Sequence, residues 1–299
     1  MDFLRLLSQY RTPFGDVFFQ GITYLAQEVF VVAVICWLFW CSNKRLAYTL
    51  GFAYFSSGLF VQGLKITFRV PRPWLLDPAF SPAESAVSGA TGYSFPSGHT
   101  QSITALFGVL AFYAKKLWQR VLCALVIFLV GFSRMYLGCH TPKDVCTSWI
   151  LTLCFAGIAY YLFYKKEYQK GKEGRISIIM AVLSLLLCIY AVFLNKNGTI
   201  ELAYAQDCLK AAGAGAAFAL GFYIESRFIQ FTPPKQLSHK IFRLILGLLV
   251  TLCIQEGLKP LIGTSLPASF IRYFLVVAWI LIIYPLLFTR FSKAGQKGI

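Results

Sequence analysis

Residues 176–194 read ISIIMAVLSLLLCIYAVFL, a run without a charged side chain. A helix needs about 20 mostly apolar residues to cross the hydrocarbon core of a bilayer, so this run predicts a transmembrane helix. The whole chain has the same character: 58% of its 299 residues are hydrophobic and 13% are charged, whereas soluble domains are about 25% charged. We therefore expect an all-α polytopic membrane protein.

Apolar runs of similar length recur along the chain and predict about nine transmembrane helices. Their expected boundaries lie near 22–41, 46–64, 100–114, 117–133, 145–164, 176–194, 208–224, 241–258 and 268–289. Residues 1–21 mix apolar with charged side chains, which is typical of a segment lying along the membrane surface.

Basic residues collect in alternate connections between these spans, which is the pattern of cytoplasmic loops. They are Lys44 and Arg45; Lys115, Lys116 and Arg120; Lys165, Lys166, Lys170, Lys172 and Arg175; Arg227, Lys235, Lys240 and Arg243; and Arg290, Lys293 and Lys297. This predicts an outward N-terminus and a cytoplasmic C-terminus. The net charge of +16 then reflects topology and attraction to anionic lipids, so we expect the bilayer as a partner and no nucleic acid.

Three short motifs before residue 150 contain most of the reactive side chains. They are Lys65 with Arg72-Pro73, then Pro96-Ser97-Gly98-His99, then Ser133-Arg134 with His140 and Asp144. In the predicted topology all three motifs lie at the outer ends of spans. They are therefore expected to form one site at the extracytoplasmic face.

Residues from all three motifs suit the binding of phosphate. Lys65, Arg72 and Arg134 provide fixed positive charge and several N–H donors for phosphate oxygens. Ser97 and Gly98 stand where a helix begins, and free backbone N–H groups at a helix start favour anions. Gly98 also allows a ligand to approach the backbone closely.

The two histidines of the motifs suit a division of catalytic work. His140 and Asp144 are four residues apart, which places them on one face of a helix. Asp144 can then hold one ring nitrogen of His140 while the other nitrogen acts as a nucleophile. His99 is left to protonate the leaving oxygen as a general acid.

The spacing Lys-x6-Arg-Pro, Pro-Ser-Gly-His and Ser-Arg-x5-His-x3-Asp resembles the signature of the type 2 phosphatidic acid phosphatase superfamily. The resemblance implies a metal-free phosphatase without a cofactor that forms a phosphohistidine at His140. It further implies that Lys65, Arg72, Ser97, Gly98 and Arg134 hold the phosphate. Residues 22–165 would form the catalytic membrane domain, and residues 176–290 a four-span extension of unknown role.

The substrate is expected to be a phosphorylated lipid, such as phosphatidate or an isoprenoid pyrophosphate. Trp74, Leu75, Leu76 and Phe80 follow Arg72-Pro73 and are candidates for an apolar lip that receives its chain. The nine-span layout resembles the glucose-6-phosphatase and sphingosine-1-phosphate phosphatase branch. This layout keeps a sugar-phosphate phosphatase open as an alternative. The same motifs would also suit a lipid phosphotransferase, and the last four spans leave open a non-enzymatic transporter or scaffold.

Two further expectations concern the surroundings of the site. The predicted location is a bacterial cell membrane with the site facing outside, or the endoplasmic reticulum with the site facing its lumen if the host is eukaryotic. Arg272 opens the ninth span and is expected to extend to the membrane interface, or else to contact a lipid headgroup.

Overall fold

The computed structural model describes residues 1–165 and 173–296. Within these ranges the secondary structure is helical, without strands, as the composition predicts. Some of the lysines predicted to lie in cytoplasmic connections have side chains outside the described part of the structure. They are Lys165, Lys166, Lys170, Lys172, Lys293 and Lys297.

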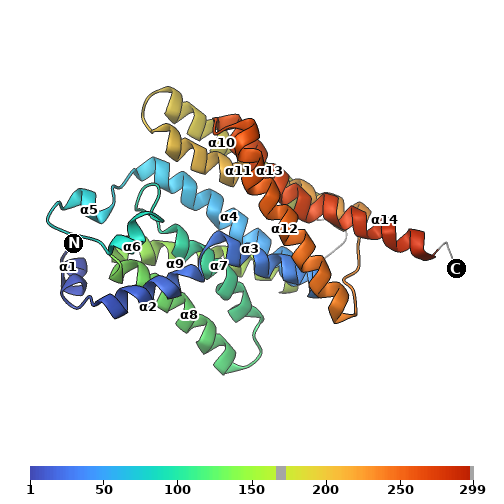
Figure 1. Cartoon of the computed structure of the whole chain (residues 1–299), viewed down its shortest axis with the longest axis horizontal. Coiled ribbons are helices and arrows are strands. Elements are labelled where there is room, and N and C mark those ends of the chain that lie inside the picture. Colours follow the sequence, from blue (N-terminus) through green and yellow to red (C-terminus); the bar gives the residue numbers. More distant parts are fainter. Residues whose placement is uncertain (166–172, 297–299) are drawn as a thin grey trace.

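Helices follow one another along the chain with short connections (Figure 1). Their bounds are α1 Asp2–Gln9, α2 Pro13–Tyr24, α3 Glu28–Trp37, η1 Leu38–Ser42, α4 Lys44–Phe68, α5 Pro73–Leu76, α6 Glu84–Val87, α7 Gly98–Tyr113, α8 Leu117–Tyr136, α9 Pro142–Tyr160, η2 Tyr161–Lys165, α10 Glu173–Lys196, α11 Leu202–Ile224, η3 Glu225–Ile229, α12 Leu237–Ile262, α13 Leu266–Ala278, η4 Trp279–Ile283 and α14 Tyr284–Gln296. The four η segments are π-helical turns. Each of the nine predicted spans falls on one helix or on two or three consecutive helical segments, and the first span is interrupted by a turn at 25–27.

Six segments in the described ranges are long and apolar enough to cross a membrane. They are Pro13–Ser42, Leu117–Tyr136, Pro142–Tyr164, Glu173–Lys196, Leu237–Ile262 and Leu266–Arg290. The other three predicted spans correspond to α4, α7 and α11. Of these, α7 has only 16 residues, while most residues of α4 and about half of those of α11 are buried by neighbouring helices. Enclosed helices need less apolar side chains than helices that face lipid.

The central element is α4, which contacts both halves of the chain. It packs against α7 and α9 of the first half and against α10 and α11 of the second half. In Figure 1 it runs between these two groups. The main apolar core continues across both of its sides, so the C-terminal helices share a core with the helices that carry the motifs.

The two ends of α4 carry different charge arrangements. At its first residue, the Lys44 ammonium pairs with Glu225, which is completely buried. Glu225 also accepts hydrogen bonds from the Tyr48 hydroxyl and from the backbone N–H of Phe231. Lys65 lies 21 residues further along the helix, a rise of about 32 Å. The basic connection and the motifs are therefore at opposite ends of the bundle.

Arg272 differs from its sequence-based expectation. Its side chain is only 7% exposed, so it does not extend to the membrane interface. The guanidinium lies over the ring of Tyr273, with Cζ 5.7 Å from the ring centroid. The neighbouring helices enclose Arg272 because α13 packs closely against α11.

Close packing of α11 against α13 depends on Gly213. A Cβ atom at this position would overlap the backbone carbonyl of Phe270, which cannot move aside as a side chain can. We predict that Gly213→Ala lowers the thermal unfolding midpoint in detergent, because overpacking costs about 1–3 kcal/mol.

Gly257→Ala on α12 is the matched control for this prediction. A Cβ atom there meets no atom within 4 Å, so the helix-favouring alanine should leave stability unchanged or raise it. Equal unfolding midpoints for the two variants would contradict the proposed role of Gly213.

Candidate active site

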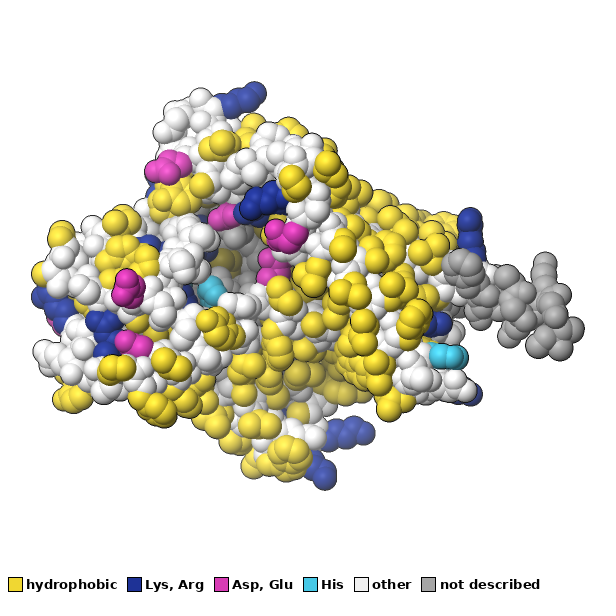
Figure 2. All heavy atoms as spheres, viewed as in Figure 1, with side chains coloured by type: hydrophobic (Ala, Val, Ile, Leu, Met, Phe, Trp, Pro, Cys, Tyr) yellow, Lys and Arg dark blue, Asp and Glu magenta, His cyan; other side chains and the backbone are white. Residues whose placement is uncertain are grey.

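The three motifs meet where α4 ends and where α7 and α9 begin. Arg69 stops α4 in a left-handed conformation with φ of 49°, and Ser97 and Thr141 are the N-caps of α7 and α9. Figure 2 shows a hollow on one face of the molecule where histidine, basic and acidic side chains gather among hydrophobic ones.

Arg72 lies at the centre of this arrangement. Its Nε donates to the carbonyl of Gly92 at 3.0 Å, and Nη2 donates to the carbonyl of Thr91 at 2.5 Å. Nη1 reaches both the carbonyl of Cys139 at 3.1 Å and Nε2 of His140 at 2.9 Å. Burial lowers the pKa of Arg72 to about 10, so the guanidinium is still charged at neutral pH.

The contact with Arg72 fixes the protonation pattern of His140. A guanidinium can only donate hydrogen bonds, so Nε2 of His140 must be the acceptor. The ring hydrogen is then on Nδ1, which lies 3.6 Å from Oδ2 of Asp144. Burial, followed by the charge of Arg72, lowers the pKa of His140 well below its ordinary value. The ring is therefore neutral at physiological pH, with its lone pair on Nε2.

Asp144 is held by two groups that sequence reasoning missed. Its Oδ2 accepts a hydrogen bond of 2.6 Å from the Ser94 hydroxyl and one of 2.8 Å from the backbone N–H of Thr141. Thr141 and Asp144 form a capping box at the start of α9. Thr-x-x-Asp before an apolar run is a sequence signal for this box. No local pattern marks Ser94, which is 50 residues away in the chain.

Arg134 and Lys65 add further positive charge to the buried site. Arg134 is only 2% exposed, yet its Nε and Nη2 have no hydrogen-bond partner among the described residues. Lys65 donates from Nζ to the carbonyl of Tyr93 at 2.6 Å. A buried donor without an acceptor is costly, and phosphate oxygens would provide the acceptors that Arg134 lacks.

The start of α7 faces the site with little side-chain bulk. The Ser97 hydroxyl accepts from the hydroxyl of Thr100 at 2.9 Å, and the Ser97 N–H donates to the backbone carbonyl of Asp144 at 3.2 Å. A Cβ atom at Gly98 would meet nothing within 4 Å. Gly98 therefore leaves the first N–H groups of α7 open to an approaching anion.

His99 is the second histidine of the cluster and is half-buried at the start of α7. The positive charges that act on it most strongly are those of Arg134, then Arg72 and Lys65. His99 is thus on the same cationic site as His140. Ser133, in contrast, pairs with the hydroxyl of Thr23 at 2.8 Å and joins α8 to α2 away from the reacting groups.

The predicted apolar lip divides into exposed and buried members. Leu75 is 67% exposed and Leu76 is 50% exposed, so both are available to contact lipid. Trp74 is half-buried. Phe80 is buried in an apolar cluster with Leu4, and its position serves the packing of the loop.

Positive charge dominates the site, since three cationic side chains surround the single carboxylate of Asp144. In the described part of the chain, no group of three or more His, Cys, Asp or Glu residues has the arrangement of a metal site. The residues that meet here are suited to hold a phosphate dianion directly.

Two family profiles match the sequence in separate regions. The PAP2 superfamily profile matches residues 46–168, which contain all three motifs. A second profile, described as the transmembrane extension of PAP2 superfamily phosphatases, matches residues 209–296. Both halves of the bundle are therefore accounted for by profiles of one superfamily.

Several curated proteins are similar to this chain. Lipid phosphate phosphatase delta of Arabidopsis thaliana is 23% identical over 84% of this chain and 64% of that protein. A dihydrosphingosine 1-phosphate phosphatase of Saccharomyces cerevisiae is 26% identical over 76% of this chain and 57% of that protein. Undecaprenyl-diphosphatase BcrC of Bacillus subtilis is 25% identical over 60% of this chain and 83% of that protein. The chain spans about six-tenths of the length of the first two relatives.

Among solved structures, the crystal structure of Aquifex aeolicus LpxE is similar with a TM-score of 0.45 and 27% sequence identity. The match covers 53% of this chain and 92% of that chain.

The two unpartnered nitrogens of Arg134 generate a binding prediction. Orthovanadate, a phosphate analogue, should raise the unfolding midpoint of the wild-type protein, because a ligand at 100 times its Kd stabilises the folded state by about 2.7 kcal/mol. Arg134→Gln should remove most of this shift, since hydrogen bonds to charged groups contribute about 1.5–3 kcal/mol.

Arg69→Gln serves as the control for Arg134→Gln. Arg69 is exposed and, in the described part of the chain, its guanidinium donates to the carbonyl of Ile66, so this variant should keep the full vanadate shift. Retention of the shift in Arg134→Gln would remove Arg134 from the anion site.

Proposed function

Because this chain belongs to the PAP2 superfamily, we propose that it is a membrane phosphatase that removes phosphate from a lipid through a phosphohistidine at His140. The observation that carries the proposal is the 2.9 Å contact between Arg72 and Nε2 of His140. It leaves the lone pair of a neutral, buried imidazole beside three cations that can hold a phosphate.

The first step transfers the phosphoryl group to the protein. The phosphate oxygens replace the hydrogen bond that Arg72 makes to His140, and Nε2 forms a bond to phosphorus while the bond to the lipid oxygen breaks. The negative charge of the bound phosphate offsets the neighbouring cations, so His99 is protonated in the complex. It gives this proton to the lipid oxygen, and the lipid leaves as an alcohol. The imidazole keeps its hydrogen on Nδ1 and gains positive charge, which Asp144 stabilises.

The second step returns the protein to its starting state. His99, now neutral, takes a proton from a water molecule, whose oxygen attacks phosphorus as the bond to Nε2 breaks. Inorganic phosphate leaves and the neutral ring of His140 is restored. In both steps Lys65, Arg72 and Arg134 stabilise the charge on the transferring group, together with the N–H group of Gly98 at the start of α7.

A lipid substrate is supported by the relatives and by the position of the site. The similar proteins of Saccharomyces cerevisiae and Bacillus subtilis are named for a phosphorylated sphingoid base and an isoprenoid diphosphate. The motifs lie at the ends of helices, opposite the basic connections that begin at Lys44. With those connections in the cytoplasm, the site faces the extracytoplasmic side.

Replacing the nucleophile should abolish turnover. We expect His140→Ala to lower phosphate release by at least about a thousandfold and to prevent the trapping of radiolabelled phosphate on the protein. The assay uses purified protein with a panel of lipid monophosphates, isoprenoid diphosphate and glucose 6-phosphate.

The other two histidines provide the comparison for His140→Ala. His99→Ala should slow the release of alcohols by about 100-fold or more while a good leaving group such as p-nitrophenol is affected less. His239 is exposed in the first turn of α12, so His239→Ala should be as active as the wild type. Normal turnover by His140→Ala would overturn the assignment of His140 as the nucleophile. Phosphate release from glucose 6-phosphate and from no lipid in the panel would exclude a lipid substrate.

The cationic set at the site leads to a prediction about metals. Because Lys65, Arg72 and Arg134 supply positive charge to the phosphate, activity should persist after dialysis against EDTA. Phosphate release is measured before dialysis, after it, and after magnesium is restored. Loss of activity that magnesium recovers would show that the three cations do not suffice.

A further inference from the structure

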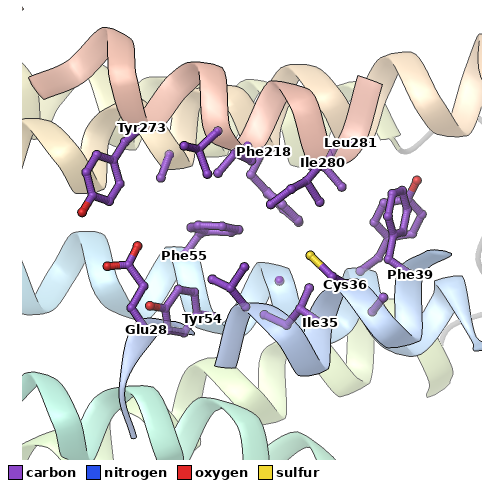
Figure 3. Close-up of a pocket in the computed structure, with 17 residues that line it drawn as sticks. Glu28, Ile35, Cys36, Phe39, Tyr54, Phe55, Phe218, Tyr273, Ile280 and Leu281 are labelled. Atoms are coloured by element: carbon purple, nitrogen blue, oxygen red, sulfur yellow. The ribbon is translucent and has the colours of Figure 1, made fainter. Parts of the chain in front are cut away.

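A narrow cavity lies in the seam between the motif-bearing half and the C-terminal half. The space between the atoms that line it amounts to about 600 Å³, a volume that includes open solvent at its mouth. Helices α3 and α4 form one wall, and α11, α13 and η4 form the other (Figure 3). The bore is almost wholly apolar, and its walls include Val32, Ile35, Phe55, Phe218, Val277 and Leu281.

One end of the cavity is polar. Figure 3 shows the carboxylate of Glu28 and the hydroxyl of Tyr273 pointing toward each other at this end, with Tyr54 beside them, and Phe39 at the opposite end. Arg272, next to Tyr273, is buried, and its Nε and Nη1 have no hydrogen-bond partner in the described part of the chain. The cavity thus has a polar mouth and an apolar bore, as an amphiphile requires.

The polar mouth adjoins the candidate active site on the α7 side. Ser102 contacts the phenol of Tyr54, and it follows His99 by one helical turn, about 4.5 Å along α7. Gln101 also donates to the carbonyl of Tyr54 at 3.0 Å. An oxygen protonated by His99 would therefore lie next to the mouth of the cavity.

The mouth adjoins the site on the α11 side as well. Lys210, which pairs with Asp207 at 2.7 Å, acts electrostatically on Glu28. Asp207 is in turn 3.7 Å from where a Cβ atom of Gly92 would be, and the carbonyl of Gly92 binds Arg72. Helix α11 therefore borders both the phosphate site and the cavity.

We infer that this cavity holds the hydrocarbon chain of the substrate while its phosphate is at His140. The inference rests on the proposed function and gives the C-terminal half a part in substrate selection. The occupant is a single chain, because the bore is narrow. Between Glu28 and Phe39 the wall formed by α3 and η1 is about 16 Å long, so the cavity favours long chains over short ones.

A competing place for the chain is the lip formed by Leu75 and Leu76. These side chains are exposed on α5, in the loop beside Arg72, and neither of them lines the cavity. The two places make different predictions: filling the cavity should affect long chains if the seam holds them, whereas polar residues on α5 should affect long chains if the lip holds them.

The test uses a substitution that fills the bore from each wall. Val32→Phe fills it from α3 and Val277→Phe from α13, both at residues that line the cavity. Their controls are Val29→Phe and Leu275→Phe on the same helices, at residues that are 57% and 37% exposed and outside the lining. The comparator for the lip is Leu75→Ser with Leu76→Ser.

KM is measured for butyl, octyl, dodecyl and hexadecyl phosphate. Filling the space of two or more methylene groups should raise KM for dodecyl and hexadecyl phosphate by about tenfold or more, with KM for butyl phosphate unchanged. The two controls should match the wild type at every length. Equal effects at all lengths, or loss of the length dependence only in the α5 serine variant, would overturn the inference.

A second measurement separates this inference from the proposed function. A dodecyl phosphonate with a diazirine at the end of its chain cannot be hydrolysed, and its crosslinks to wild-type protein are mapped by mass spectrometry. Crosslinks on α3, α11 or α13 residues of the cavity support the inference even if no phosphate is released from any substrate. Crosslinks confined to α5 or to the lipid-facing α12 overturn it even if the protein is an active phosphatase.

Discussion

The hydrogen bonds of the Arg72 guanidinium hold the site together. They join the carbonyls of Thr91 and Gly92 to the turn that contains Cys139 and His140. Segments separated by almost seventy residues thereby share one buried cation. Since a guanidinium has five donors in a planar fork, no other side chain could make this set of contacts with the same geometry.

The remaining motif is tied to this centre through Asp144. Oδ2 of Asp144 accepts a hydrogen bond from the Ser94 hydroxyl, and the backbone carbonyl of Asp144 accepts one from the N–H of Ser97. The start of α7 is therefore positioned by the start of α9. Arg72 and Asp144 between them bring the ends of three helices into one arrangement, with α4 as the support on which both halves of the chain pack.

Much of this arrangement could be predicted from the sequence, because its signals are local. Apolar runs indicated the helices, and the four-residue spacing of His140 and Asp144 indicated a shared helix face. The capping box at Thr141 was readable in the same way. The first apolar segment begins at Pro13, earlier than the predicted residue 22. The sequence did not indicate this start because polar residues near it interrupt the apolar pattern.

Other features depend on tertiary contacts that no local pattern records. Ser94 meets Asp144 only when the loop folds back on α9. Phe80 looked like part of an exposed lip, but it is buried because the short N-terminal helix packs over it through Leu4. Arg272 was expected at the membrane interface and is enclosed by the contact of α13 with α11. The seam cavity could not be predicted either, since its walls come from helices in both halves of the chain.

The ion pair between Lys44 and Glu225 has a consequence for the order in which the chain is made. Lys44 opens the helix that ends at the site, and its buried partner follows 181 residues later. While the ribosome is still producing the intervening helices, Lys44 lacks this counter-charge. The end of α4 opposite the site thus reaches its final electrostatic state only after α11 and Glu225 have been synthesised and inserted.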